Sequence, residues 1–427
     1  YCIYAFFLVP LRAKYTIALI LEELGMKKII LIAIALLWTA SSLLQARTQE
    51  EASAIASQFI SQRVATIGSA KRVAAASKVT LAFTQNQIDQ TTPALFIFNS
   101  GTDDGFVLVS AEDEGRTILG YSDDGHFDKT NIPTNMQFWL QMYADELARY
   151  NANKQPGKPA LKRAAVQTSY PTITPILGNV EWGQGEPYNN LCPTVNGERC
   201  VTGCVATAIS QIMYVHKHPT KGTGSHSYTS ETHQLTSSAN FSATTYDWSN
   251  MLPVYTRNNY NTTQANAVAT LMHHVGIVAE MDYDPEGSGA ISAYALSQMA
   301  TYFGYDAGIR TLPKDYMREE EVMTAIISDL EQGHPVFVNG RTKNDEGHAF
   351  VCDGMQSDGY LHINWGWYGG ANGYFALSAL DPEQQGTGGS ASDMAFTEEV
   401  NVYTGIQPDQ GGTAQPLVTV SKIVRTS

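Results

Sequence analysis

One stretch of the chain joins a glycine-bearing turn to a predicted helix rich in small residues: Thr202-Gly203-Cys204-Val205-Ala206-Thr207-Ala208-Ile209-Ser210-Gln211-Ile212-Met213. Cys204 falls in the first turn of this helix, where unpaired amides and the helix dipole stabilise an anion such as a thiolate. Ile209, Ile212 and Met213 give the helix an apolar face for burial, so the thiol would stand on a rigid element. These residues alone leave two interpretations open, a nucleophile and a structural cysteine.

A nucleophilic thiol needs a proton-transfer partner, and a histidine block further along the chain offers one. His348 stands at the head of an apolar strand, in Gly347-His348-Ala349-Phe350-Val351. A histidine there can pair with the thiol and later protonate the leaving amine. The next predicted strand ends in Asn364-Trp365-Gly366-Trp367. The Asn364 carbonyl would hold the imidazole tautomer and Trp365 would shield that bond, although a surface histidine and ordinary core tryptophans are the alternative interpretations.

A tetrahedral intermediate also needs hydrogen-bond donors for its oxyanion. They commonly are the backbone amide of the nucleophile and one side-chain amide. Gln184, within Glu181-Trp182-Gly183-Gln184-Gly185, is the candidate. Its flanking glycines would let the backbone approach the thiol closely. The alternative interpretation is a simple turn.

Four sequence blocks stand in a fixed order along the chain: Trp182–Asn189, Thr202–Ala208, Gly347–Val351 and Asn364–Trp367. Together they resemble the streptopain family of secreted bacterial cysteine peptidases. The resemblance covers residues 170–408, with a looser match over 48–151. It implies a papain-like domain behind a prodomain that keeps the enzyme latent.

The resemblance also implies roles for single residues. Carried over position by position, it makes Cys204 the nucleophile, His348 the base and Gln184 the oxyanion donor. Asn364 and Trp365 would support the histidine. The family further implies a hydrophobic side chain at the second substrate residue before the scissile bond, called P2.

A glycine-rich loop and the absence of a metal or cofactor are also expected for this site. The family has a mobile glycine-rich loop near the active site, and a similar but less glycine-rich segment occurs here at Gly386-Thr387-Gly388-Gly389-Ser390. We expect no cofactor and no metal. The histidine pairs at 216 and 218 and at 273 and 274 lack a third ligand at a spacing that a zinc site requires.

The composition is that of a large globular protein. Of 427 residues, 43% are hydrophobic and 16% are charged, which predicts two or three structural units. Helical spacing occurs at 48–64, 135–150, 204–215, 265–275, 293–303 and 319–332. Strands are expected at 94–98, 106–110, 117–121, 336–339, 349–353, 360–364 and 373–377. The predicted fold class is α+β, a papain-like domain of helices plus an antiparallel sheet behind a small α+β prodomain.

These patterns divide the chain into five segments. We expect an upstream segment and signal peptide over 1–46 (signal 26–46), an inhibitory prodomain over 47–150, a cleavable linker over 151–166, a papain-like peptidase domain over 167–408, and a tail or the start of a further C-terminal region over 409–427. The signal is predicted because Lys27 and Lys28 precede a short apolar run and small residues up to Ala46. The linker holds prolines and a basic cluster without apolar periodicity, and such loops are easily cleaved.

Charge narrows the range of partners. The net charge of −14 comes from 41 acidic and 27 basic residues without a block of like charge, which disfavours nucleic acid and anionic membranes. We expect a secreted protein without a membrane anchor, because the apolar run is shorter than the ~20 residues that span a bilayer. The expected partners are protein or peptide substrates and the chain's own prodomain as an intramolecular inhibitor.

The cysteines fit an exported protein with one reactive thiol. Cys192 and Cys200 flank a short loop that a disulfide would close, and this pairing is left open. Cys352 lies in an apolar run and is expected to be a buried thiol.

Two other functions fit parts of the pattern. One is a non-catalytic binder or protease inhibitor on the same scaffold, but such scaffolds usually lose the nucleophile, whereas this chain retains every residue of the site. The other is an amidase or acyltransferase that uses the same Cys-His dyad. The leading prediction is a secreted cysteine endopeptidase made as a latent zymogen.

Overall fold

The computed structural model describes residues 46–67, 79–87, 89–113, 115–153, 169–341, 347–379 and 399–411. All the elements below belong to one compact unit, Thr48–Ser427. Nearly all of the predicted signal peptide and linker, the glycine-rich loop Gly386–Ser390 and most of the predicted tail lie outside the described residues. In the part of the chain that the structure describes, no helix has the length and hydrophobicity needed to cross a membrane.

The described residues of the predicted prodomain form two helices and four strands. Helix α4 (Gln49–Ile67) begins at a capping box, in which the Thr48 and Glu51 side chains each accept from the other's backbone N–H, at 3.2 and 2.8 Å. The strands β1 (Val79–Asn86), β2 (Pro93–Ser100), β3 (Phe106–Ser110) and β4 (Ile118–Ser122) pair antiparallel in chain order. Helix α6 (Thr134–Asn153) follows them.

In the described part of the predicted peptidase domain, four α-helices combine with the rest of the sheet. The helices are α7 (Cys204–His216), α8 (Thr262–Val278), α9 (Ser292–Phe303) and α10 (Glu319–Glu331). The strands are β9 (Arg310–Pro313), β10 (Val336–Arg341), β11 (Gly347–Met355), β12 (Leu361–Asn364), β13 (Gly373–Phe375) and β14 (Glu399–Thr404). Two hairpins stand apart from this sheet, β5 (Thr194–Val195) with β6 (Glu198–Arg199) and β7 (Ser225–Thr229) with β8 (Thr236–Asn240).

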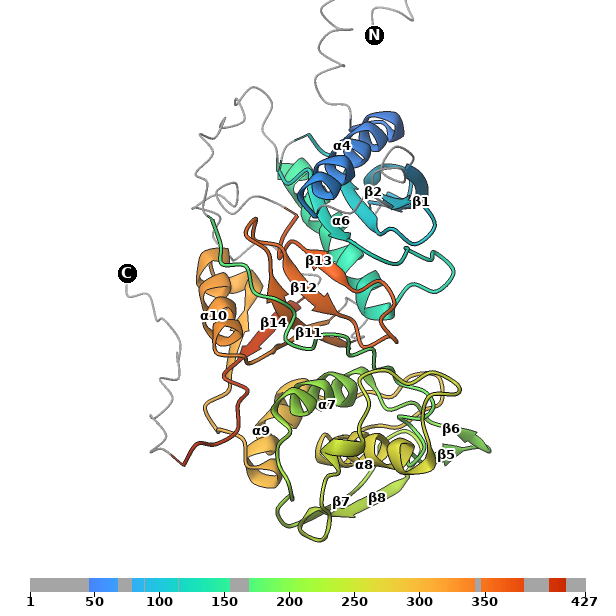
Figure 1. The fold of residues 1–427 in the computed structure, drawn as a ribbon, viewed down its shortest axis with the longest axis vertical. Helices are drawn as coiled ribbons and strands as arrows, with labels where there is room; N and C mark the ends of the chain where they lie inside the picture. The colour runs from blue at the N-terminus through green and yellow to red at the C-terminus, as the bar shows by residue number, and fades with distance from the viewer. Residues whose placement is uncertain are drawn as a thin grey trace, which may run out of the picture. The chain divides into compact units, whose positions relative to one another are not determined.

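One ten-stranded sheet runs through both predicted domains, in the order β1-β2-β3-β4-β13-β12-β11-β10-β14-β9. The junction is the antiparallel pair β4–β13, where Tyr121 pairs with Tyr374 and Gly120 with Phe375. Figure 1 shows β13, β12 and β11 between α6 and α7. The prodomain therefore adds strands to the peptidase sheet.

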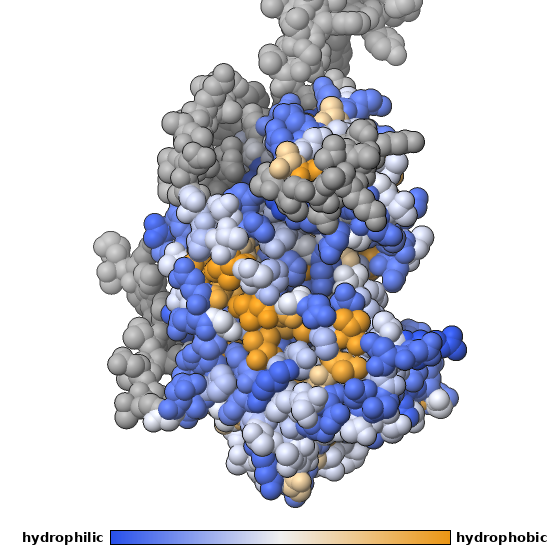
Figure 2. Space-filling model, viewed as in Figure 1, coloured by the Kyte–Doolittle hydropathy of each residue, from blue (hydrophilic) through white to orange (hydrophobic). Residues whose placement is uncertain are grey.

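Two hydrophobic cores lie on the two faces of this sheet. Side chains alternate between the faces of a strand, so in β10 Phe337 joins the core around α7, α8 and α9, whereas Val338 joins the core around α6 and α10. The second core is shared, because Trp139 of α6 packs on Phe350 and Trp365 at ring distances of 5.6 and 6.2 Å. Figure 2 shows hydrophobic residues across the middle of one face, near the level of α7, within a mainly hydrophilic surface.

Candidate active site

Cys204 is the first residue of α7 and borders a groove of about 940 Å³. The helix is fixed by burial, since every residue of Val205–Met213 is buried. Its first turn is held by Thr207, whose N–H and hydroxyl both donate to the Gly203 carbonyl, at 3.1 and 3.0 Å. The cysteine side chain itself is half-buried. The predicted placement of this thiol at the start of a rigid helix is confirmed.

The surroundings of the Cys204 thiol favour its neutral form. Burial raises its pKa above the ordinary value, while the backbone N–H groups of Ala349, Val205 and Cys204 itself act in the opposite direction. The helix start thus supplies amides that favour a thiolate, but burial outweighs them. The Ala349 N–H also places the thiol against β11, one residue after His348.

His348 borders the same groove, but its ring packs against a different part of the chain. In β11, Ala349 and Val351 belong to the core on the α7 side, and Phe350 belongs to the core shared with α6. Because side chains alternate along a strand, His348 faces the α6 side. There the His348 ring lies 5.9 Å from the Phe138 ring, measured between centroids.

Two side chains of α6, Phe138 and Asn135, contact the strands around the histidine. Phe138 packs directly on Gly340 of β10, since a Cβ at Gly340 would lie 2.0 Å from the Phe138 ring. Asn135 is fully buried, and its Nδ2 donates to the carbonyls of Ala349 at 2.6 Å and Trp365 at 3.0 Å. Helix α6 therefore bridges β11 and the end of β12 beside the predicted base.

Asn364 ends β12, and its side chain is held in a buried network. Its Oδ1 accepts from Gln211 Nε2 and from the Gly366 N–H, both at 3.0 Å, and its Nδ2 donates to the Val180 carbonyl at 2.8 Å. These contacts fix the amide next to α7. The support of His348 by Asn364 stays a prediction, for a form in which the imidazole turns toward the groove.

Trp365 is fully buried among aromatic rings. Its ring lies 4.9 Å from that of Phe350 and 5.1 Å from that of Phe375. The indole N–H donates to the Ala371 carbonyl at 2.9 Å. Trp365 is thus part of the core that α6 shares with the sheet, and its role as a shield for the histidine stays a prediction.

Gln184 lies in a loop that is tied to the segment before the nucleophile. Its carbonyl accepts from the Thr202 N–H at 3.1 Å. The glycines on either side of Gln184 lie against the side chain of Tyr368. A Cβ at Gly183 would lie 2.4 Å from Tyr368 Cζ, and one at Gly185 would lie 2.6 Å from Tyr368 Oη. The two glycines therefore make room for the Tyr368 phenol, and the expected close approach of this loop to the thiol stays a prediction.

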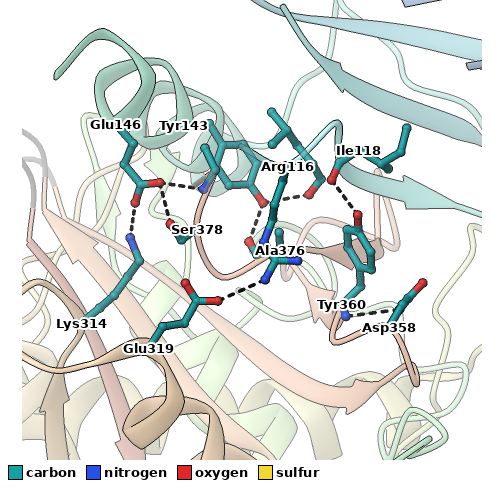
Figure 3. Close-up of polar contacts among 12 residues, drawn as sticks. Arg116, Ile118, Tyr143, Glu146, Lys314, Glu319, Asp358, Tyr360, Ala376 and Ser378 are labelled. Atoms are coloured by element: carbon teal, nitrogen blue, oxygen red, sulfur yellow. Dashed lines mark hydrogen bonds and ion pairs between the residues drawn. The ribbon is translucent and has the colours of Figure 1, made fainter. Parts of the chain in front are cut away.

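Buried ion pairs join the predicted prodomain to the predicted peptidase domain (Figure 3). Glu146 of α6 pairs with Lys314 and accepts from the Ala379 N–H at 2.7 Å. Arg116 pairs with Glu319 at 3.2 Å. Burial raises the pKa of Glu319 to about 7, although Arg116 and then Lys314 act to lower it. Each domain thus contributes one acidic and one basic side chain to the interface: Glu146 and Arg116 from the prodomain, Glu319 and Lys314 from the peptidase domain.

Two tyrosine hydroxyls complete this interface around the β4–β13 junction (Figure 3). Tyr143 of α6 has its hydroxyl 3.0 Å from the Leu119 carbonyl and 2.5 Å from the Ala376 carbonyl. The Tyr360 hydroxyl donates to the Ile118 carbonyl at 2.6 Å. Backbone carbonyls next to the junction are therefore satisfied by side chains.

Within the described residues, the three cysteines other than Cys204 are buried thiols. They are Cys192, Cys200 and Cys352, and burial raises the pKa of Cys192 to about 12. The expected burial of Cys352 as a thiol is confirmed. Cys192 and Cys200 are not bonded to each other in this structure.

Three residues around the site were not singled out by sequence reasoning: Asn135, Phe138 and Tyr368. The Asn135 amide reaches a carbonyl 214 residues further along the chain. Within α6, asparagine and phenylalanine resemble ordinary positions of an amphipathic helix. Tyr368 offered one signal, because it directly follows the Asn364–Trp367 block.

Comparison with known proteins gives matches over most of the chain. The profile of the Peptidase C10 family matches residues 182–375, and that of the Spi protease inhibitor matches residues 45–147. Streptopain from Streptococcus pyogenes is 32% identical over 381 residues, which are 85% of this chain and 92% of streptopain. The thiol protease/hemagglutinin PrtT from Porphyromonas gingivalis is 32% identical over 373 residues, which are 84% of this chain and 42% of PrtT. A solved fragment of prointerpain A from Prevotella intermedia is 31% identical, with a TM-score of 0.64, and the match covers 78% of this chain and 100% of the fragment.

Proposed function

Because this chain belongs to the Peptidase C10 family and is a cysteine peptidase made as a zymogen with a prodomain, we propose that Cys204 is its nucleophile and His348 its base. The observation that carries the proposal is the position of the thiol. It stands at the start of a buried helix and against the backbone of the residue that follows His348. With the thiol in this position, a local rotation of the His348 ring would be enough to bring the imidazole to it.

In the proposed reaction the Cys204 thiolate attacks the scissile carbonyl and His348 protonates the leaving amine. Water then hydrolyses the thioester, with His348 as the base. The Cys204 N–H and the Gln184 side-chain amide would stabilise the oxyanion. The hydrogen bond from Thr202 to the Gln184 carbonyl supports this, because it ties the Gln184 loop to the segment that leads into Cys204. Asn364 and Trp365 would orient the histidine once it faces the groove.

We infer that the prodomain maintains latency by holding the histidine and not by filling this groove. The described residues that line the groove all come from the range 204–403, outside the prodomain. The prodomain instead places Phe138 against His348 and Asn135 across β11 and β12. With the imidazole turned toward α6, nothing in the thiol's surroundings outweighs the burial that keeps it protonated.

For substrates we propose proteins or peptides with a hydrophobic side chain at P2. One wall of the groove supports this, because Val205, Ala290 and Ile291 line it with apolar side chains. Ile291 is 67% exposed, so its side chain is accessible to a substrate that enters the groove.

Maturation and export complete the proposal. We propose that the enzyme cleaves itself within the linker 151–166 and is exported by the signal at 26–46, so that it acts as a secreted peptidase. The basic, proline-containing composition of the linker and the basic start of the signal support these two steps.

A Cys204→Ala variant tests the proposal. The purified wild-type chain should mature in dilute solution, cut a long denatured protein internally, and take up one equivalent of a peptidyl epoxide on Cys204. The alanine variant should remain at full length and lose activity by more than about a thousandfold, because the nucleophile is gone. Intact mass before and after peptidase digestion of the labelled protein locates the adduct.

Cys352→Ala is the matched control, since it removes another thiol from the same domain and should still label at Cys204. Maturation of Cys204→Ala at the wild-type rate would contradict self-cleavage, and an adduct on another cysteine would contradict the nucleophile. A denatured protein that stays whole while small amides are hydrolysed would identify an amidase instead.

A further inference from the structure

The phenol of Tyr368 lies across the loop that carries Gln184. Its ring carbons Cζ, Cε1 and Cε2 would stand 2.4 to 2.6 Å from a Cβ at Gly183, and its Oη would stand 2.6 Å from one at Gly185. Only glycine at both positions admits the ring. Tyr368 has a backbone φ of 55°, in the left-handed region that disfavours side chains with a Cβ. A tyrosine is thus kept where the backbone alone would favour glycine.

Two hydrogen bonds connect Tyr368 to the two ends of this loop. The Gly185 N–H donates to Tyr368 Oη at 2.6 Å, and the Tyr368 N–H donates to the Trp182 carbonyl at 3.1 Å. The Gln184 N–H also faces the phenol: burial raises the pKa of Tyr368, and the N–H groups of Gly185 and Gln184 act to lower it. Tyr368 therefore binds the backbone both before and after Gln184, at Trp182 and at Gly185.

The opposite side of the loop is fixed to the nucleophile's segment. The Gln184 carbonyl accepts from the Thr202 N–H, two residues before Cys204, and Trp182 is anchored by its indole N–H, which donates to the Leu252 carbonyl at 2.9 Å. The backbone of Gln184 thus has one fixed neighbour on the Cys204 side and Tyr368 on the other. Burial alone does not account for Tyr368, since its side chain is 46% exposed.

We propose that Tyr368 is a positioning residue, which holds the Gln184 backbone so that the Gln184 side-chain amide reaches the oxyanion. The proposal rests on the function proposed above for Gln184. An oxyanion donor is effective only when it is fixed in advance, because reorganising it during the reaction would consume the stabilisation that it provides. The Tyr368 hydroxyl supplies that fixation through the residue next to the donor.

The Tyr368→Phe variant removes only the hydroxyl. For the matured enzyme we expect kcat to fall about tenfold with KM changed by less than about twofold, a smaller loss than the ~100-fold that follows removal of an oxyanion donor itself. Alkylation of Cys204 by iodoacetamide should keep its rate, since that displacement forms no oxyanion. Tyr260→Phe is the matched control, because it removes the hydroxyl of a half-buried tyrosine of the same domain that has no role in the proposed site, and it should change neither kcat nor KM.

Gln184→Ala, measured in parallel, separates the positioning role of Tyr368 from the proposal that Gln184 is an oxyanion donor. A lower kcat in both variants supports the positioning role. A lower kcat in Gln184→Ala alone overturns the role of Tyr368 and leaves the oxyanion assignment intact. An unchanged kcat in Gln184→Ala overturns both, while labelling of Cys204 still reports on the nucleophile. A slower alkylation in Tyr368→Phe would show general damage to the site and would also overturn the positioning role.

A second experiment uses the contact between Gly183 and the ring. Gly183→Ala should lower kcat strongly in the wild-type background, because the new Cβ meets the phenol. In a Tyr368→Gly background the same change should have little further effect, since the ring is gone and glycine suits the backbone there. Losses that add in the double variant would mean that the glycine serves another neighbour, and they would overturn the proposal.

Discussion

The Phe138 ring lies against the face of β11 to which His348 points. Phe138→Ala should free the imidazole to turn toward the thiol while the chain is still uncleaved. An imidazolium beside the thiol lowers its pKa. We therefore expect Cys204 in the full-length protein to react with iodoacetamide about tenfold faster, the effect of one pKa unit on a mostly protonated thiol. Intact mass at early times, before any self-cleavage, measures this rate.

Phe127→Ala is the matched control for that measurement. Phe127 is a buried phenylalanine of the same prodomain core, 6.0 Å from the Phe106 ring, and it belongs to a loop instead of α6. Its loss should loosen the core without moving the histidine. Equal acceleration in both variants would show that latency depends on the general stability of the prodomain and not on the contact with His348.

At the level of single residues, Cys204 and His348 could be proposed from the sequence because each stands at a recognisable position, a helix start and a strand start. Their contacts could not be predicted in the same way. The contact between His348 and Phe138 had no such signal. It depends on how α6 packs on the sheet, and the residues involved are ordinary for an amphipathic helix.

At the level of elements, α6 is joined to the peptidase domain by a buried charge pair. Lys314→Met should leave Glu146 buried without its cation and lower the free energy of unfolding by about 3–5 kcal/mol. Arg318→Met breaks an exposed pair with Glu321 and should change the free energy of unfolding far less, because solvent screens this pair. Urea unfolding in a Cys204→Ala background, which prevents self-cleavage, measures both. Similar losses in the free energy of unfolding from the two changes would mean that the buried Glu146–Lys314 pair stabilises the chain no more than an exposed pair does.

Most elements of the fold were predicted from periodicity, whereas seven strands were missed: β1, β5, β6, β7, β8, β9 and β14. Each predicted helix matches one of α4, α6, α7, α8, α9 or α10 within a few residues. Strands β7 and β8 were missed because Ser225–Thr229 and Thr236–Asn240 consist mainly of polar residues. Strand β1 was missed because its side chains are half-buried or exposed, without clear alternation. Their pairing comes from neighbours that periodicity does not reveal.

At the scale of the whole molecule, the family, the α+β papain-like fold with its prodomain, and the peptidase class predicted from the sequence are confirmed. The single sheet through both domains was not predicted. It requires β4 to pair with β13, and both strands are short, with neighbours in sequence that already offer partners. Tyr143 of α6 contacts both sides of this junction, since its hydroxyl lies by the carbonyls of Leu119 and Ala376, and periodicity does not reveal such a contact.

The pH dependence of the whole zymogen should reflect Glu319. Its pKa of about 7 in the folded chain lies above the ordinary value of 4.5, so folding favours the protonated form. The stability that this provides is fully present below about pH 4.5 and is lost as the pH rises through 7. The shift corresponds to about 3 kcal/mol. In the Cys204→Ala background, Glu319→Gln should remove most of this loss when unfolding is compared at pH 4.5 and pH 8.

Glu321→Gln is the control for this comparison, because Glu321 lies on the same helix and is exposed. It should leave the loss of stability toward high pH as in the parent chain. If Glu319→Gln also leaves the pH dependence unchanged, then Arg116 compensates the buried carboxylate fully and the interface carries no pH dependence of its own.

The short junction between β4 and β13 has a consequence for the enzyme after maturation. Departure of the prodomain turns β13 into an edge strand, whose unpaired backbone groups are a template for aggregation. The backbone connection is brief: two residue pairs, followed by the Ala376 N–H, which donates to the Leu119 carbonyl at 2.9 Å. If the prodomain leaves, as proposed above, the edge that it uncovers is therefore too short to pair extensively with a strand of another chain.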